Sequence, residues 1–159
     1  MGLNSEHINP FVIASQNILA TVCNEEIAIG KLSIKNKPYY AEDVVVIIGV
    51  TGELEGQVIF NLSEETARAI VSKMMMGAPV PVLDEMAKSG ICELANMMLG
   101  NTATNFYNNG IKVDITPPSL LFGQGIQVST LKGEFMSIPL QLKSTGLTFE
   151  ISVCIGEKK

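Results

Sequence analysis

The longest helical pattern in the sequence spans residues 84–108, where apolar residues on two sides border a thin polar face. This polar stripe consists of Glu85, Ser89, Glu93, Asn96 and Gly100. Its central members, Ser89, Glu93 and Asn96, fall within about 60° of one another at helical spacing. The pattern predicts a helix that is buried on two sides and turns the polar stripe outward.

The chain before this helix predicts a first helix and a strand. Asn9 and Pro10 are typical of a helix start, because an N-cap residue is followed by proline at the first helical position. This helix is expected to end near Cys23. Residues 26–36 then alternate as in a strand, and Gly30 indicates a bulge or bend within it.

A hairpin and a second helix follow. Residues 42–62 predict two strands joined by a turn at residues 51–56. The run 44–50 is β-branched and apolar on both faces, so it is expected in the interior of a sheet. Ser63 is a candidate N-cap for a helix that ends at Gly77.

The remaining segments predict mostly strands. Met74 to Met76 favour core filling over an exposed recognition surface. Residues 111–116 alternate as a strand that is broken by prolines 117–118. Residues 119–131 are expected to start as a loop and to become a strand, with two glycines as flexible joints. Residues 133–155 predict a hairpin.

The two halves of the chain follow the same order of helix, strand, loop and hairpin, approximately over residues 9–77 and 84–156. Asn17 stands in the first helix where Asn96 stands in the long helix. Glu93 and Ser89 have no counterpart in the first half, so only one polar stripe is expected. The pattern predicts one α+β domain over residues 1–159: a pseudo-two-fold duplicated unit with a mostly antiparallel sheet and long helices packed on one side.

Composition narrows the possible functions. The chain has 159 residues, 47% of them hydrophobic, which suits one domain with a full core. Its net charge is −5 and its 11 basic residues are dispersed, so nucleic-acid binding is not expected. No apolar run is long enough for a membrane span, and no secretory signal is recognisable, so a cytoplasmic protein without membrane attachment is expected.

The polar stripe has two possible interpretations. Most polar helix faces are only solvated, but such faces usually carry several Lys and Glu, whereas this one offers a hydroxyl, an amide and few charges. Cys23, Cys92 and Cys154 are expected to be reduced core residues. His7 is the single histidine, near a terminus expected to be mobile, so neither a metal site nor a histidine-dependent enzyme for small molecules is favoured.

The motif S-x-x-x-E-x-x-N on the second of two repeated helices, followed by G-I-K-V-D-I-T-P-P and G-x-G, resembles the CheC/CheX/FliY family of chemotaxis phosphatases. The resemblance covers roughly residues 9–155. With one intact motif, no C-terminal extension and this size, the chain is most similar to CheX. The resemblance implies dephosphorylation of a phosphorylated CheY-type response regulator.

The same resemblance implies roles for the polar stripe. Asn96 would orient a water for in-line attack on the aspartyl phosphate, and Glu93 would pair with the active-site lysine of the response regulator. Ser89 fills the first motif position, Glu85 extends the partner-binding face, and Gly100 would relieve crowding against the docked partner. The protein would need no metal or cofactor of its own, because the response regulator supplies Mg²⁺.

Two further expectations rest on the resemblance. CheX-like proteins dimerise through edge strands, so a homodimer is expected, with residues 126–131 or their neighbours as the edge. The other interpretation of that stretch is a strand covered within the monomer. An alternative to the phosphatase is a non-catalytic CheX-like interaction domain that binds a receiver domain or motility component.

Overall fold

The computed structural model describes residues 5–35, 39–129 and 134–157. Its helices and strands follow one another as α1 (Ser5–Cys23), β1 (Ile27–Ile29), β2 (Ser33–Lys35), β3 (Tyr39–Tyr40), β4 (Val44–Gly52), β5 (Leu54–Leu62), α2 (Glu64–Met74), α3 (Glu85–Asn108), β6 (Val113–Ile115), β7 (Ser119–Phe122), β8 (Gln127–Val128), β9 (Phe135–Leu142) and β10 (Thr148–Glu157). Among the described residues, none of the helices is both long and apolar enough to cross a membrane.

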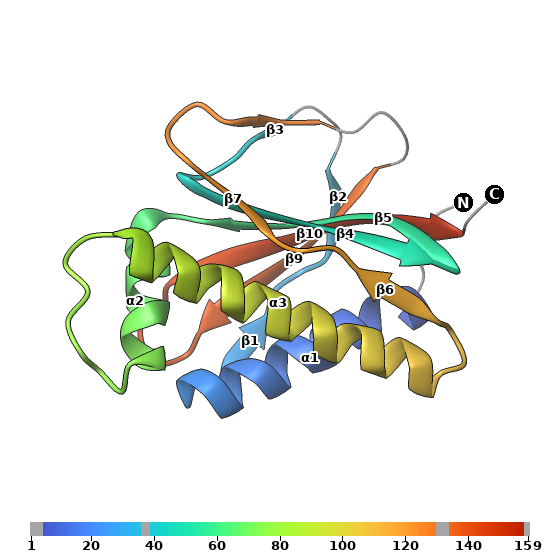
Figure 1. Cartoon of the computed structure of the whole chain (residues 1–159), viewed down its shortest axis with the longest axis horizontal. Coiled ribbons are helices and arrows are strands. Elements are labelled where there is room, and N and C mark those ends of the chain that lie inside the picture. The colour runs from blue at the N-terminus through green and yellow to red at the C-terminus, as the bar shows by residue number, and fades with distance from the viewer. Residues whose placement is uncertain (1–4, 36–38, 130–133, 158–159) are drawn as a thin grey trace.

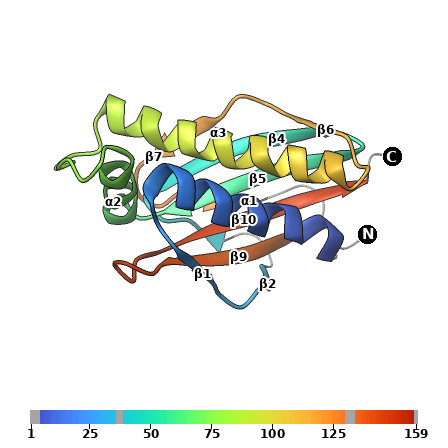
Figure 2. The ribbon, with the colours of Figure 1, turned by 90° about the horizontal axis from the view of Figure 1, so that it is seen from below.

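One antiparallel sheet organises the fold, in the order β1-β9-β10-β5-β4-β6. Strand β2 continues the pairing along β9, and β7 continues it along β4. Helices α1 and α3 lie side by side across one face of this sheet (Figures 1 and 2), whereas the small β3–β8 sheet lies on the other side. The expected α+β class, with a mostly antiparallel sheet and long helices on one side, is confirmed.

The strand order is similar when read from either end. The long strands β5 and β10 pair at the centre, and each is flanked by its hairpin partner, β4 or β9. The short strand β1 of the first half pairs with β9 of the second, and β6 of the second half pairs with β4 of the first. Each half therefore contributes an outer strand to the sheet of the other half. The exact bounds of the two repeats, residues 9–77 and 84–156, stay a prediction.

The expected break at Gly30 is present and has a clear cause. Strands β1 and β2 both pair with β9, and between them the Gly30 N–H donates to the carbonyl of Pro139 at 2.8 Å. Pro139 has no N–H to return, so the ladder is interrupted there. A Cβ at Gly30 would lie 3.1 Å from the Pro139 ring, which explains the small residue at this position.

Two predictions about loops are wrong. The β4–β5 turn is tighter than residues 51–56, because β5 begins at Leu54 and Gly52 turns the chain with a φ of +116°. Residues 119–122 are strand β7 and not loop, since β4 offers them a free edge that only the folded chain reveals. The hairpin of β9 and β10 forms as expected, with Gly146 in its turn at a φ of +80°.

The first helix begins earlier than predicted, at Ser5, and Pro10 lies inside it. His7 and Ile8 are only 7% and 4% exposed, so His7 is a buried helical residue and not part of a mobile terminus. Asn9 and Pro10 are a local signal for a helix start, and a proline inside the helix costs one hydrogen bond. Burial of the first turn favours the earlier start more strongly, because it removes apolar surface from water.

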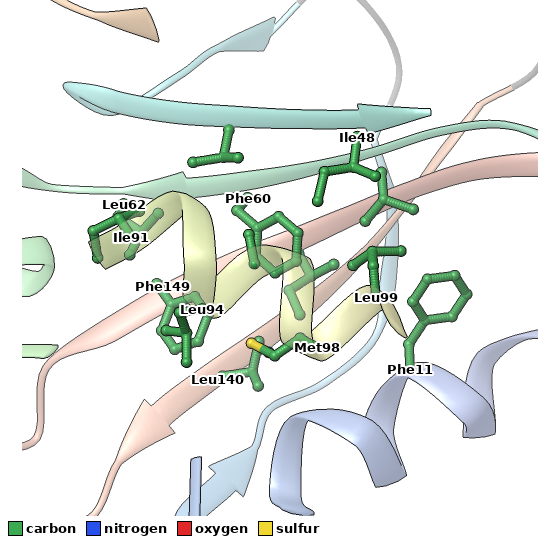
Figure 3. Packing of buried hydrophobic residues seen from close by; sticks show 14 of the residues in the cluster. Phe11, Ile48, Phe60, Leu62, Ile91, Leu94, Met98, Leu99, Leu140 and Phe149 are labelled. Carbon is green, nitrogen blue, oxygen red and sulfur yellow. The ribbon is translucent and has the colours of Figure 1, made fainter. Parts of the chain in front are cut away.

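The core lies between the helices and the sheet. Figure 3 shows Ile91, Leu94, Met98 and Leu99 of α3 directed among apolar side chains of the strands and of α1, and all four are at most 4% exposed. Phe106 of α3 also meets Phe11 of α1 edge to face, with ring centroids 5.8 Å apart. These contacts fix the inner face of α3, and thereby the direction in which its outer face points.

The interpretation of Met74 to Met76 as core-filling residues is wrong in part. Helix α2 is capped as expected, because the Ser63 hydroxyl accepts a hydrogen bond from the Thr66 N–H at 3.1 Å, but the two methionines that follow the helix leave the core. Met74 packs against the core, whereas Met75 is 38% exposed and Met76 is 98% exposed. Met76 lies at a left-handed φ of +57° after the helix has ended, so it points away from the protein.

Candidate functional site

The polar stripe is presented by the N-terminal two-thirds of α3. The helix starts at the predicted place, because the side chain of Asp84 accepts a hydrogen bond from the Ala87 N–H at 2.9 Å. Ser89 and Glu93 are exposed and Asn96 is half-buried, while Ile91 and Leu94 on the other faces are buried. The expectation that the stripe points outward is confirmed in the structure.

An open groove of about 820 Å³ runs along this face of α3. Its second wall consists of the last residue of β6, the segment that connects β6 to β7, and β7 itself. The groove is lined by Glu85, Lys88, Ser89, Cys92, Glu93 and Asn96 from α3, and by Ile115, Thr116, Pro117, Pro118, Leu120 and Phe122 from the second wall. Four of the five predicted site residues therefore line one concave surface.

Gly100 is the exception, since it does not line the groove. A Cβ built at Gly100 would meet nothing within 4 Å, so the surface there is open. Its carbonyl oxygen accepts a hydrogen bond from the Thr104 hydroxyl at 3.2 Å. The structure thus places Gly100 one turn beyond the groove, on a surface that leaves room for another molecule.

Glu93 and Asn96 keep their polar atoms available. Neither side chain takes part in a hydrogen bond or ion pair within the part of the chain that the structure describes. They stand three residues apart, which separates their Cα atoms by about 4.5 Å along the helix axis. An unoccupied carboxylate and an unoccupied carboxamide are therefore offered side by side to whatever enters the groove.

Lys88 closes one end of the groove. Its Nζ lies 3.2 Å from a carboxylate oxygen of Glu85 and 5.1 Å from the centre of the Phe122 ring on β7. Both partners also line the groove. Glu85 is thus already paired to a neighbour, unlike Glu93, although its side chain is 93% exposed.

Cys92 lies on the groove wall and not in the core, so its predicted location is wrong. Its thiol is half-buried, and burial raises the pKa of Cys92 above the usual value. Cys23 is a core residue as expected, where burial raises its pKa to about 11. Cys154 is half-buried and packs beneath the β3–β8 sheet.

The sequence did not identify the second wall as part of the site. The one available signal was local: the two prolines at 117 and 118 end a strand and cannot donate to a ladder. The folded chain adds a non-local contact, because β4 brings residues 115–122 opposite α3. Lys88 was noticeable only as the sole basic residue of its helix.

The arrangement suits alignment of a reactant more than covalent chemistry. Among residues 5–35, 39–129 and 134–157, no three His, Cys, Asp or Glu gather closely enough to hold a metal ion. A carboxamide both donates and accepts hydrogen bonds without a pKa near neutrality, and a carboxylate can pair with an incoming cation. Such groups can position a water and a charged partner for a reaction that takes place on that partner.

Comparison with known proteins gives the family. A family model described as Chemotaxis phosphatase CheX matches residues 44–141. Over 142 residues the chain is 32% identical to the CheY-P phosphatase CheX of Thermotoga maritima, and the match covers 89% of this chain and 91% of that protein. The chain belongs to the CheX family of chemotaxis phosphatases, as the resemblance of its motifs indicates.

Solved structures agree with this assignment. A CheC-like superfamily protein from Shewanella sp. PV-4 has a TM-score of 0.84 and 26% identity, with 97% of this chain and 99% of that chain covered. A chain from the CheX–CheY–BeF₃–Mg²⁺ complex of Borrelia burgdorferi has a TM-score of 0.81 and 29% identity, with 95% of this chain and 98% of that chain covered. The fold described above is therefore that of CheX-like proteins.

Proposed function

We propose that this protein hydrolyses the aspartyl phosphate of a phosphorylated CheY-type response regulator. The observation that carries the proposal is the pair of Glu93 and Asn96 on one wall of an open groove, where neither side chain has a partner among the residues that the structure describes. Membership of the CheX family supports it, as does the relative from Thermotoga maritima, which is named a CheY-P phosphatase.

Asn96 orients the attacking water in this proposal. Phosphoryl transfer depends mainly on alignment and on stabilising charge, and the protein needs little covalent chemistry of its own. The Asn96 amide accepts a hydrogen bond from the water through its oxygen and donates one toward the phosphoryl oxygens through its nitrogen. Its half-buried position on a core helix restricts its rotamers, which favours a fixed geometry.

Glu93 sets the position of the partner. Its carboxylate pairs with the active-site lysine of the response regulator, and such a charge-assisted bond fixes the register of docking. Ser89, one turn earlier, and Glu85 contribute to the same contact face, while the open surface at Gly100 leaves room for the backbone of the partner.

The response regulator brings the Mg²⁺ ion and the acyl phosphate, so the protein uses no metal or cofactor of its own. Support for this comes from the Borrelia burgdorferi complex, which contains CheX, CheY and Mg²⁺ together. Bond changes are then confined to the partner: water adds to phosphorus, the aspartyl oxygen leaves as carboxylate, and inorganic phosphate is released.

The direct test is phosphate release from each CheY-type receiver encoded in the same genome, phosphorylated with acetyl phosphate and freed of excess reagent. Addition of this protein should accelerate release from at least one receiver above its spontaneous rate. Binding without acceleration from any receiver would replace this proposal with the non-catalytic interaction domain.

We also propose a cytoplasmic homodimer. The location follows from the partner, since response regulators of this type act inside the cell.

The dimer edge that was expected at residues 126–131 needs revision. Gln127 and Val128 already pair with β3, and residues 130 and 131 lie outside the described part of the chain. The edge formed by β1 and β2 is the better candidate for the dimer contact. Leu32, just before β2, is 40% exposed, and Ile34, within β2, is 57% exposed. Light scattering of the wild type and of Ile34→Lys tests this, and a monomeric wild type would contradict it.

A further inference from the structure

The second wall of the groove is built on an irregularity in the sheet. Strand β4 pairs with β6 on one side of this irregularity, where Val50 faces Ile115. On the other side β4 pairs with β7, where Ile47 faces Ser119. Between these pairs β4 contributes two residues and the connecting segment contributes three, residues 116–118. One extra residue opposite a regular strand is the definition of a bulge, and bulges redirect the chain at functional sites.

Thr116 holds this bulge in place through Gly49 of β4. The Thr116 N–H donates to the Gly49 carbonyl at 3.0 Å, and the Gly49 N–H donates to the Thr116 hydroxyl at 2.8 Å. Pro117 and Pro118 have no N–H to offer to β4. The hydroxyl of Thr116 therefore takes the hydrogen bond that a regular backbone ladder would have accepted from Gly49.

Gly49 is small because Thr116 lies against it. A Cβ at Gly49 would be 3.0 Å from Oγ1 and 3.1 Å from Cγ2 of Thr116, closer than ordinary contacts. The glycine lets the bulged segment lie directly on the strand. The two residues thereby fix how far Pro117 and Pro118 stand from α3 across the groove.

We propose that Thr116 is a positioning residue for the phosphatase reaction. Through its two hydrogen bonds to Gly49 it sets the width of the groove, so that the phosphorylated loop of the receiver fits between the bulge and Glu93. Thr116 acts on docking and not on the water, because it lies on the wall opposite Asn96. This inference rests on the proposed function.

The test separates docking from chemistry. Steady-state phosphate release gives KM for the phosphorylated receiver and kcat. Thr116→Val keeps the shape and removes the acceptor, and it should raise KM about tenfold with kcat nearly unchanged, as for loss of uniform binding. Thr116→Ser keeps the hydroxyl and should stay within about twofold of the wild-type KM. Gly49→Ala should raise KM as Thr116→Val does, since the new methyl group displaces the hydroxyl.

Thr145→Val is the matched control. Its hydroxyl also accepts a backbone N–H, from Leu147 at 3.2 Å, in an exposed turn that does not line the groove. Hydrogen–deuterium exchange of peptides covering residues 45–52 should accelerate in Thr116→Val and not in the control. An unchanged KM in Thr116→Val, or a Thr116→Ser variant as impaired as Thr116→Val, would overturn the inference. Absence of any acceleration by the wild type would instead refute the proposed function itself.

Discussion

Lys88 of α3 and Phe122 of β7 meet across one end of the groove, where the lysine Nζ lies 5.1 Å from the ring centre. The contact joins the two walls through a cation and an aromatic face, an interaction worth about 0.5–1 kcal/mol at an exposed site. Within the described groove lining Lys88 is the only positive charge, and Glu85 and Glu93 are negative. Lys88 therefore offsets part of the repulsion that an anionic phosphoryl group meets there.

Lys88→Met keeps the aliphatic stem and removes this charge. We expect KM for the phosphorylated receiver to rise about threefold at low salt, because a charge near a docking site mainly affects association. The difference from wild type should shrink as ionic strength increases, since salt screens exposed charges. Lys112→Met, at an exposed residue between α3 and β6 that does not line the groove, is the control. A KM difference that persists unchanged at high salt would contradict an electrostatic role.

Cys92 offers a chemical test of the groove. Burial raises the pKa of its thiol, so iodoacetamide should alkylate it more slowly at pH 7.5 than it alkylates a small exposed thiol. Because Cys92 lines the groove between Ser89 and Glu93, phosphatase activity should fall in proportion to the alkylated fraction, as followed by mass spectrometry.

Cys92→Ser is the control for this experiment. It should retain activity and resist inactivation, although its other cysteines are still present. Inactivation of Cys92→Ser at the wild-type rate would place the sensitive thiol elsewhere.

Acid should weaken the fold by protonating Glu25, whose side chain is 3% exposed. The Glu25 carboxylate accepts hydrogen bonds from the hydroxyl and the N–H of Ser144, and it lies 3.3 Å from the Lys73 Nζ. Burial alone would raise the pKa of Glu25, but the hydrogen bonds from Ser144 and the charge of Lys73 outweigh burial and hold this pKa below its usual value. A lowered pKa means that its stabilisation is fully present above about pH 4.5 and is lost as the pH falls through the folded-state value.

Glu25→Gln should therefore lower the free energy of unfolding at pH 7 by about 2 kcal/mol, the usual worth of hydrogen bonds to a buried charge. It should also flatten the acid dependence measured by urea unfolding between pH 5 and pH 3. Part of the acid dependence should remain in this variant, because Glu150 also has a lowered pKa. Burial alone would raise the pKa of Glu150, but the hydrogen bonds to its carboxylate outweigh burial. Glu26→Gln, at a side chain that is 83% exposed, should leave the curve unchanged.

The two faces of α3 should respond differently to substitution. Met98 is 1% exposed and lies in the core, two residues from Asn96 on the outer face. Met98→Ala should cost about 2–5 kcal/mol of stability, because it removes buried methylene and sulfur groups. Its phosphatase activity per folded molecule should stay near wild type at a temperature well below unfolding. A loss of kcat in this variant as large as its loss in an Asn96 variant would show that the two faces are not independent.

The polar stripe was predictable because helical periodicity is a local property. Residues 85–100 carry enough apolar neighbours to fix which face is buried, so Ser89, Glu93 and Asn96 could be placed before the fold was known. The interior position of β4, between β5 on one side and β6 and β7 on the other, was predictable for a similar reason, since its residues are apolar on both faces. These features depend on short stretches of chain, where composition and spacing carry the information.

The second wall was not predictable, because it depends on pairing between distant segments. The bulge at residues 116–118 exists only when β4 pairs with β6 and β7 in registers that differ by one residue. The start of α1 was misplaced because burial of Ile8 outweighs the local signal at Pro10. Met76 was misplaced because the sequence does not reveal that the chain turns away with a positive φ.

The most direct test of the account is the phosphatase activity of Asn96→Ala against a receiver that the wild type dephosphorylates. The account predicts a loss of kcat of about 10²-fold or more, as expected for removal of one positioned transition-state group. Thermal unfolding should be unchanged, because the side chain has no hydrogen-bonding partner in the described structure. An Asn96→Ala variant that folds normally and releases phosphate at the wild-type rate would contradict the proposed mechanism.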